Sequence, residues 1–175
     1  MAEVDIEIRD GLSSDAEILA YIGATSFKQA YRPHSNDADL ESHVSNYFSS
    51  SFVRDEIEQH NRRYLLSTVN GRAAGIAKFR HAPCPVAGGD ENAFELQQLY
   101  VLADMQGYGL GRRLVACLIE AAGKADANGV WLSAWEFADW ATGFYRTVGF
   151  REIGKVEFSL GETTYTDLLM WMSLE

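Results

Sequence analysis

The part of the sequence best suited to chemistry is a glycine-rich segment between a predicted strand and a predicted helix. It runs from Gln106 to Gly111 and reads Gln-Gly-Tyr-Gly-Leu-Gly. The first backbone N–H groups of a helix have no partner inside the helix, and the helix dipole is positive at that end. Gly109 and Gly111 carry no side chain, so a ligand can approach the backbone closely. The segment therefore predicts a binding site for an anion such as a pyrophosphate.

Two common phosphate-binding motifs do not fit this segment. The Walker pattern requires lysine and then serine or threonine after its last glycine, whereas two arginines follow Gly111. The dinucleotide fingerprint G-x-G-x-x-G, if it started at Gly107, would end on an arginine. What remains is the pattern Gln-x-x-Gly-x-Gly, which starts at Gln106.

The rest of the chain predicts the elements that must hold this turn. Apolar runs and alternation predict strands over 4–9, 64–69, 73–79, 94–101, 130–136, 150–159 and 164–172. Helical periodicity predicts helices over 14–31, 37–48, 52–60, from the turn to about 127, and 139–148. Ser14 and Glu17 match a capping box, Asn70-Gly71 a two-residue hairpin turn, and Asn128-Gly129 a helix end. This order predicts an α/β fold, a mixed sheet flanked by helices.

Composition limits the classes of function. The 175 residues fit one domain, and the net charge of −10 argues against a nucleic-acid partner. That acidity suits a cationic substrate, but it is also what keeps many proteins soluble. No apolar run is long enough to predict a membrane span or a membrane partner, and the acidic start does not read as a signal peptide, so we expect a cytoplasmic protein. Two cysteines and four scattered histidines predict neither a disulfide framework nor a metal site.

Three segments together resemble one known family. They are the Gln-x-x-Gly-x-Gly turn, the strand Leu-Gln-Gln-Leu-Tyr-Val before it, and residues 141–150, which read A-x-x-F-Y-x-x-x-G-F. The set is similar to the motifs of the GCN5-related N-acetyltransferase (GNAT) superfamily. This resemblance covers nearly the whole chain and implies a single N-acetyltransferase domain over 1–175. It also implies a mostly antiparallel central sheet, splayed between the fourth and fifth strands.

The resemblance implies acetyl-coenzyme A as co-substrate and no metal. Backbone groups of Leu99, Tyr100 and Val101 would bind the pantetheine arm. The pyrophosphate would lie on the turn, at Gln106, Gly107, Tyr108, Gly109, Leu110, Gly111 and Arg112. Near the coenzyme arm, many members carry asparagine where this chain has Ala138, which cannot make that side-chain contact.

Amine acetylation needs a base for the ammonium proton and an acid for the departing thiolate. Glu95 lies eleven positions before Gln106 and matches the family's strand base, although it could also be a simple charged strand end. Glu136 is a second carboxylate expected near the same place. The family motif makes Tyr145 the candidate acid and a further coenzyme contact, with a merely packed tyrosine as the alternative. Attack is expected to be direct, because Cys84 and Cys117 are poorly placed as nucleophiles.

The acceptor is the least determined part. Short matches, including Ser-Phe-Lys-Gln-Ala-Tyr at 26–31 and Trp135-Glu136, are similar to PaiA-type polyamine acetyltransferases, so Tyr31, Trp135 and Glu136 become candidate substrate contacts. The four tryptophans are expected mostly in the core. Carboxylates that could meet a polycation, or simply face solvent, are Asp37, Asp39, Glu41, Glu136 and Asp167. A protein N-terminus or lysine as acceptor, and a non-catalytic regulator that binds acetyl-coenzyme A, remain alternatives, and the last strand could pair across a homodimer.

Overall fold

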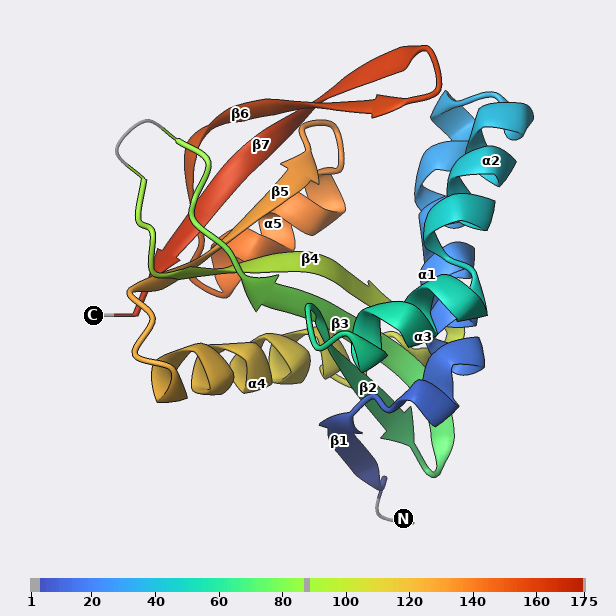
Figure 1. Cartoon of the computed structure of the whole chain (residues 1–175), viewed down its shortest axis with the longest axis horizontal. Coiled ribbons are helices and arrows are strands. Elements are labelled where there is room, and N and C mark those ends of the chain that lie inside the picture. The colour runs from blue at the N-terminus through green and yellow to red at the C-terminus, as the bar shows by residue number, and fades with distance from the viewer. Residues whose placement is uncertain (1–3, 87–88, 175) are drawn as a thin grey trace. The chain divides into compact units, whose positions relative to one another are not determined.

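The computed structural model of the chain describes residues 4–86 and 89–174 (Figure 1). The strands are β1 (Ile6–Asp10), β2 (Arg63–Val69), β3 (Arg72–His81), β4 (Ala93–Val101), β5 (Gly129–Trp135), β6 (Arg151–Leu160) and β7 (Thr163–Ser173). The helices are α1 (Ala16–Tyr31), α2 (Asp37–Tyr47), α3 (Ser50–Glu58), α4 (Leu110–Lys124) and α5 (Asp139–Thr147). This order confirms the predicted succession of helices and strands.

The seven strands form one sheet in the order β1-β2-β3-β4-β5-β7-β6. The pairs β1–β2, β5–β7 and β6–β7 are antiparallel, whereas β4 and β5 are parallel. The parallel register covers Ala93–Glu95 opposite Gly129–Trp131 and ends before either strand does. The mostly antiparallel sheet, with its fourth and fifth strands parting, is therefore the one the family resemblance implied.

The chain divides into two compact units. The first unit comprises the residues up to Lys78 together with Gln98–Val115, and the second comprises Phe79–Gln97 and the residues from Ala116 onward. The core of the first unit joins α1, the strands and the start of α4, as seen in the burial of Leu19, Ile76 and Leu110. A core of the second unit packs Trp131 and Leu169 against Ala82, whose carbonyl accepts a 2.9 Å hydrogen bond from the Trp131 indole.

The β2–β3 hairpin confirms the turn that the sequence predicted. Asn70 and Gly71 have φ values of +50° and +76°. Two consecutive positive φ angles are what a two-residue type I′ turn requires, and asparagine followed by glycine supplies them at low cost.

Some local predictions were wrong. No side chain caps α1 at its start; instead Asp15 accepts the Leu12 N–H at 2.8 Å and pairs with Arg9, so the expected Ser14 capping box is absent. Helix α4 ends at Lys124 rather than near 127. The expectation that the tryptophans lie mostly in the core holds for Trp131 and Trp135, which are buried, whereas Trp140 is 64% exposed. The absent capping box concerns contacts that depend on the folded neighbourhood.

The first unit contains a buried ion pair between neighbouring elements. Lys78 on β3 lies 2.6 Å from the Glu56 carboxylate on α3, and Tyr64 on β2 donates a 2.6 Å hydrogen bond to the same carboxylate. The Lys78 ammonium also lies 5.5 Å from the ring centroids of Phe52 and Tyr64. Burial, and then the bond to Glu56, raise the pKa of Tyr64 above its ordinary range. This cluster ties α3 to the sheet through paired rather than isolated charges.

We predict that Lys78→Met lowers the free energy of unfolding by about 3 kcal/mol, because it removes the nearest cation of the buried Glu56 carboxylate and leaves it only Arg62, at 3.7 Å. Urea denaturation measures the loss. The control is Lys124→Met, which removes an exposed pair with Glu120 on α4 and should change stability little. The double variant Glu56→Gln/Lys78→Met should recover part of the loss; equal effects of Lys78→Met and Lys124→Met would contradict the prediction.

Candidate functional site

In the first unit, the chain leaves β4, passes through a short 3-10 turn at Ala103–Met105 and enters α4 through the glycine-rich segment. The first bond of α4 runs from the Arg113 N–H to the Gly109 carbonyl at 3.2 Å, which makes Gly109 the N-cap. Glycine has no side chain with which to cap a helix. The N–H groups of Leu110, Gly111 and Arg112 therefore have no acceptor inside the helix and remain for a ligand.

Two glycines give this turn its shape. Gly107 and Gly109 have φ values of +91° and +73°, and a Cβ built at either position would meet nothing within 4 Å. Positive φ angles beside a helix start direct successive amides toward one point, which suits an oxyanion. The sequence suggested Gly109 and Gly111 as the open positions. In the structure Gly107 and Gly109 form the bend, and Gly111 lies in the first turn of α4.

The other residues of the turn contribute in different ways. Tyr108 is 41% exposed, and Gln106 and Arg112 are also exposed. Leu110 is buried in the core of the first unit, so it holds the start of α4 in place and offers a ligand only its backbone. Upstream, the side chains of Leu99, Tyr100 and Val101 are half-buried at the end of β4.

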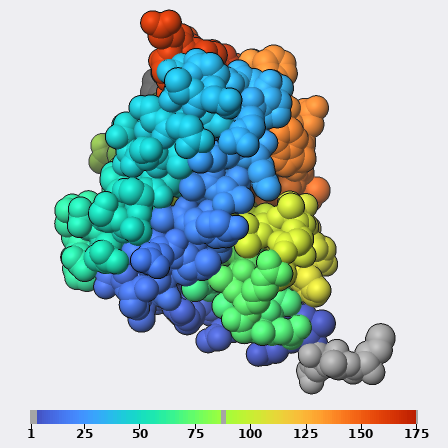
Figure 2. Space-filling model, turned by 90° about the vertical axis from the view of Figure 1, so that its right-hand side faces the viewer, coloured from blue at the N-terminus to red at the C-terminus, as the bar shows by residue number. Residues whose placement is uncertain are grey.

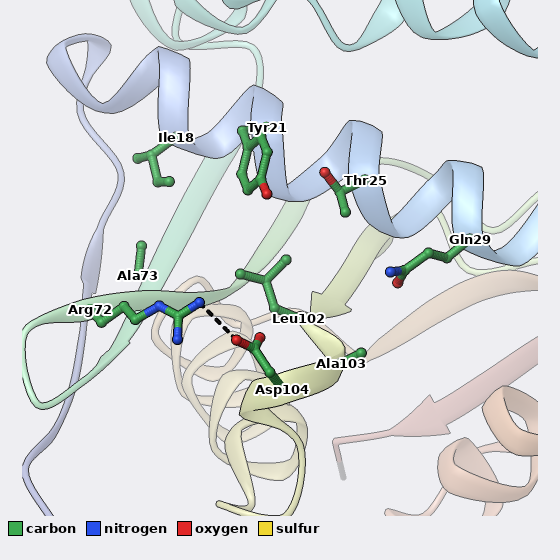
Figure 3. Close-up of a pocket in the computed structure, with 9 residues that line it drawn as sticks. All are labelled: Ile18, Tyr21, Thr25, Gln29, Arg72, Ala73, Leu102, Ala103 and Asp104. Atoms are coloured by element: carbon green, nitrogen blue, oxygen red, sulfur yellow. Dashed lines mark hydrogen bonds and ion pairs between the residues drawn. The ribbon is translucent and has the colours of Figure 1, made fainter.

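A pocket of about 410 Å³ lies in the first unit beside this segment (Figure 3). Its lining residues come from one face of α1, from the start of β3 and from the segment after β4: Ile18, Tyr21, Thr25, Gln29, Arg72, Ala73, Leu102, Ala103 and Asp104. Arg72 and Asp104 form a 2.7 Å ion pair there. In Figure 2 the blue surface of α1 meets the green β2–β3 turn and the yellow segment after β4. Tyr31 is not among the lining residues; its ring stacks on Phe27 at 4.5 Å.

In the second unit, the candidate base Glu95 lies on β4 and is paired with Arg80 on β3. The guanidinium Nε lies 2.5 Å from Oε2 of Glu95, whose side chain is 16% exposed. Glu95 is opposite Trp131 in the parallel register, so the two side chains share one face of the sheet. Arg80 fixes the orientation of the carboxylate, which makes Oε1 the oxygen for a proton or a bridging water.

The candidate acid Tyr145 lies on α5, half-buried, with its ring beside those of Phe144 and Phe150 at centroid distances of 5.4 and 5.7 Å. Burial raises the pKa of its hydroxyl above the ordinary value. The group therefore stays protonated at neutral pH, as a proton donor must.

The remaining candidates of the second unit lie where β5 leads into α5. Trp135 is buried, with its ring 5.6 Å from that of Tyr165, and Glu136 forms a 2.9 Å ion pair with Lys155. Ala138 is buried at the N-cap of α5, where its carbonyl accepts the N–H of Thr142. The position that could have held an asparagine thus has a backbone role in starting the helix.

The predicted site residues thus form two groups. The first unit contains Tyr31, Leu99, Tyr100, Val101 and the turn from Gln106 to Arg112; the second contains Glu95, Trp135, Glu136, Ala138 and Tyr145. Sequence reasoning missed Arg80, and it missed Gln97, whose Oε1 is buried with no hydrogen-bond partner in the described ranges. Strand alternation from Glu95 would have indicated Gln97, but no local signal reveals the partner of a carboxylate on a neighbouring strand.

The structure gives no support for cysteine chemistry. Cys84 is buried, and burial raises the pKa of its thiol; Cys117 is half-buried on α4.

Among the residues that the structure describes, no cluster of three or more His, Cys, Asp or Glu side chains could hold a metal ion. None of the helices within 4–86 and 89–174 is both long and apolar enough to cross a membrane.

A mixed sheet in which β4 and β5 run parallel over a short register, and a helix start with open amides after β4, define the class as an α/β protein whose α4 start is suited to an anion. Comparison with known proteins gives the family. Residues 15–150 match the model of the acetyltransferase (GNAT) family. The chain belongs to this family and is an acetyltransferase, as the sequence predicted.

Individual proteins that resemble this chain are consistent with this family. An uncharacterised N-acetyltransferase of Mycobacterium bovis is 28% identical over 157 residues, which cover 90% of this chain and 96% of the relative. Among solved structures, the PaiA N-acetyltransferase of Thermoplasma acidophilum in complex with coenzyme A has a TM-score of 0.78 at 20% identity, covering 97% and 99% of the two chains. A Salmonella typhimurium protein solved with its cofactor acetyl-coenzyme A has a TM-score of 0.69 at 18% identity, covering 98% and 95%. At these identities the structures show that the fold is shared.

Proposed function

We propose that the protein transfers the acetyl group of acetyl-coenzyme A to the primary amine of a small, cationic, polyamine-like acceptor. The observation that carries this proposal is the start of α4, where Gly107 and Gly109 leave the first backbone amides open to a pyrophosphate. Two similar folds were solved with coenzyme A or acetyl-coenzyme A, which supports the same co-substrate here. The net charge of −10 supports a cationic acceptor.

The proposed reaction is a direct transfer. The amine nitrogen attacks the thioester carbonyl, a C–N bond forms and the C–S bond breaks. Glu95 accepts the amine proton, directly or through water, and Tyr145 protonates the departing thiolate. The negative oxygen of the tetrahedral intermediate would be held by the backbone N–H of Tyr100 or Val101, which also lie where the pantetheine arm would run.

The acceptor contacts, the extent of the domain, its location and its assembly are further parts of this proposal. Tyr31, Trp135 and Glu136 are our candidate acceptor contacts, and Ala138 is a backbone neighbour of the coenzyme arm. We also propose that residues 1–175 work as a single N-acetyltransferase domain. Its cytoplasmic location and its assembly as a homodimer stay predictions.

An amine panel tests the function directly. Purified protein with acetyl-coenzyme A should release free thiol faster with polyamines than with water alone, because neutral amines are stronger nucleophiles. If peptides outcompete polyamines, the acceptor is a protein N-terminus or lysine. If acetyl-coenzyme A binds tightly in calorimetry while every amine is inert, the protein is a binding regulator and the proposal is wrong.

We predict that Gly109→Ala weakens acetyl-coenzyme A binding about tenfold or more, because it disturbs amides that would bond a charged phosphate. Calorimetry measures the dissociation constant. The matched control is Gly71→Ala in the hairpin turn, where φ is also positive, at +76°, and the Cβ also has open space. Both variants should lose similar stability from backbone strain, but Gly71→Ala should bind normally. Equal affinities of the two variants would contradict this role for the turn.

We predict that Glu95→Gln lowers kcat/KM about 100-fold near neutral pH, because the amine must then lose its proton unaided. The rate of the variant should keep rising with pH toward the pKa of the free amine, about 10.4, beyond the point where the wild-type rate levels off. The control is Glu157→Gln, an exposed carboxylate on β6. A pH–rate profile identical in shape to wild type would remove Glu95 as the base.

A further inference from the structure

Asp167 on β7 is a buried carboxylate without a cation. Its residue is only 6% exposed, and its Oδ1 is buried with no hydrogen-bond partner in the described part of the chain. The ion pairs found within residues 4–86 and 89–174 do not include it. A buried polar atom without a partner destabilises a fold, so its presence calls for a ligand that would satisfy it.

The strand register places Asp167 among aromatic side chains. Asp167 is opposite Trp135 on β5 and Val156 on β6, and opposite residues share a face of the sheet. Tyr165 lies two positions away on the same face, and its ring meets that of Trp135 edge to face at 5.6 Å. A carboxylate beside aromatic rings is the usual surrounding of a bound ammonium group, which the rings attract through their π faces.

Ser133 on β5 is an exposed neighbour of this carboxylate. Its hydroxyl lies near enough to the Asp167 carboxyl to lower the pKa of that group, and Ser133 itself is exposed although it sits within β5. By strand alternation Ser133 shares the face of Trp131 and therefore of Glu95, which is opposite Trp131. Asp167 thus lies on the same face of the second unit as the candidate base, beside an exposed serine.

No lysine or arginine within residues 4–86 and 89–174 forms an ion pair with Asp167. Lys155, the nearest lysine in the β6 sequence, is adjacent to Val156 and so lies on the opposite face of the strand, where it pairs with Glu136 at 2.9 Å. Arg80, which shares the face of Glu95, is bound to that carboxylate. Burial raises the pKa of Asp167, and the nearby Ser133 hydroxyl only partly opposes this. An external cation would restore the charged form.

We propose that Asp167, with Ser133, Trp135 and Tyr165, forms a subsite for a second ammonium group of the acceptor, separate from the amine that is acetylated. This inference rests on the proposed function and deepens it, because it makes the preferred acceptor a diamine or longer polyamine. Asp167 is then a specificity residue: it binds the far end of the acceptor and takes no part in proton transfer.

The test uses three kinds of acceptor matched in length: an α,ω-diamine, the amino alcohol and the simple alkyl monoamine. A series of diamines first defines the best length for the wild-type protein. The variant Asp167→Asn keeps the shape of the side chain and removes its charge. We expect its kcat/KM for the diamine to fall about tenfold to hundredfold through KM, the loss typical of a charged hydrogen bond. Rates with the monoamine and the amino alcohol should stay within about twofold.

A second variant protects the test against misfolding. Ser133→Ala changes an exposed residue, and it should lower the diamine-to-monoamine ratio in the same direction but less. Urea unfolding verifies that the compared proteins are folded, and Glu157→Gln, exposed on β6, should leave the ratio unchanged.

The outcomes separate this inference from the proposed function. A wild-type protein that acetylates no amine contradicts the function itself. A wild-type protein that acetylates monoamines and diamines equally contradicts only the subsite. The same holds if the ratio of diamine to monoamine kcat/KM is unchanged in both Asp167→Asn and Ser133→Ala. An equal loss for all three acceptors would show a structural or catalytic role for Asp167. An equal loss for the diamine and the amino alcohol would show a neutral hydrogen bond in place of an ammonium site.

Discussion

The open backbone amides at the start of α4 are the constraint on which the first unit's chemistry depends. A helix normally satisfies these groups with a side-chain cap, and here the N-cap is Gly109. Leu110, packed in the core, fixes the helix start, while two positive φ angles set the direction of the amides before it. The fold thus keeps the positive N-terminal end of α4 rigid and open to an anion. No lysine or arginine side chain has to be positioned for this.

The second unit contains the two side chains proposed for proton transfer. Arg80 orients the Glu95 carboxylate by an ion pair, and burial among phenylalanine rings keeps the Tyr145 hydroxyl protonated. These two groups are suited to opposite tasks, accepting and donating a proton, because their surroundings differ. Asp167 lies on the same sheet face as Glu95 but in an aromatic setting, which favours binding a cation over exchanging protons with it.

Much of the fold could be predicted from local patterns. Asn70-Gly71 specified its hairpin because few residues tolerate two positive φ angles, and the Gln-x-x-Gly-x-Gly turn specified a helix start for the same kind of reason. Local patterns could not predict which side chains become hydrogen-bond or ion-pair partners in the folded chain. Nothing near Asp15 in sequence shows that it accepts the Leu12 amide while Ser14 leaves α1 uncapped, and nothing near Glu95 indicates Arg80. The burial of Asp167 and the exposure of Trp140 likewise depend on neighbouring strands and helices.

The ion pair of Lys78 with Glu56 has a chemical consequence for an acetyltransferase. An amine must reach a thioester to attack it, and the Lys78 ammonium is enclosed, with only 6% of the residue exposed, 2.6 Å from a carboxylate and 5.5 Å from the centroids of two aromatic rings. Lys78 is therefore shielded from self-modification by the activated acyl donor, and the contact that anchors α3 also keeps this amine inert.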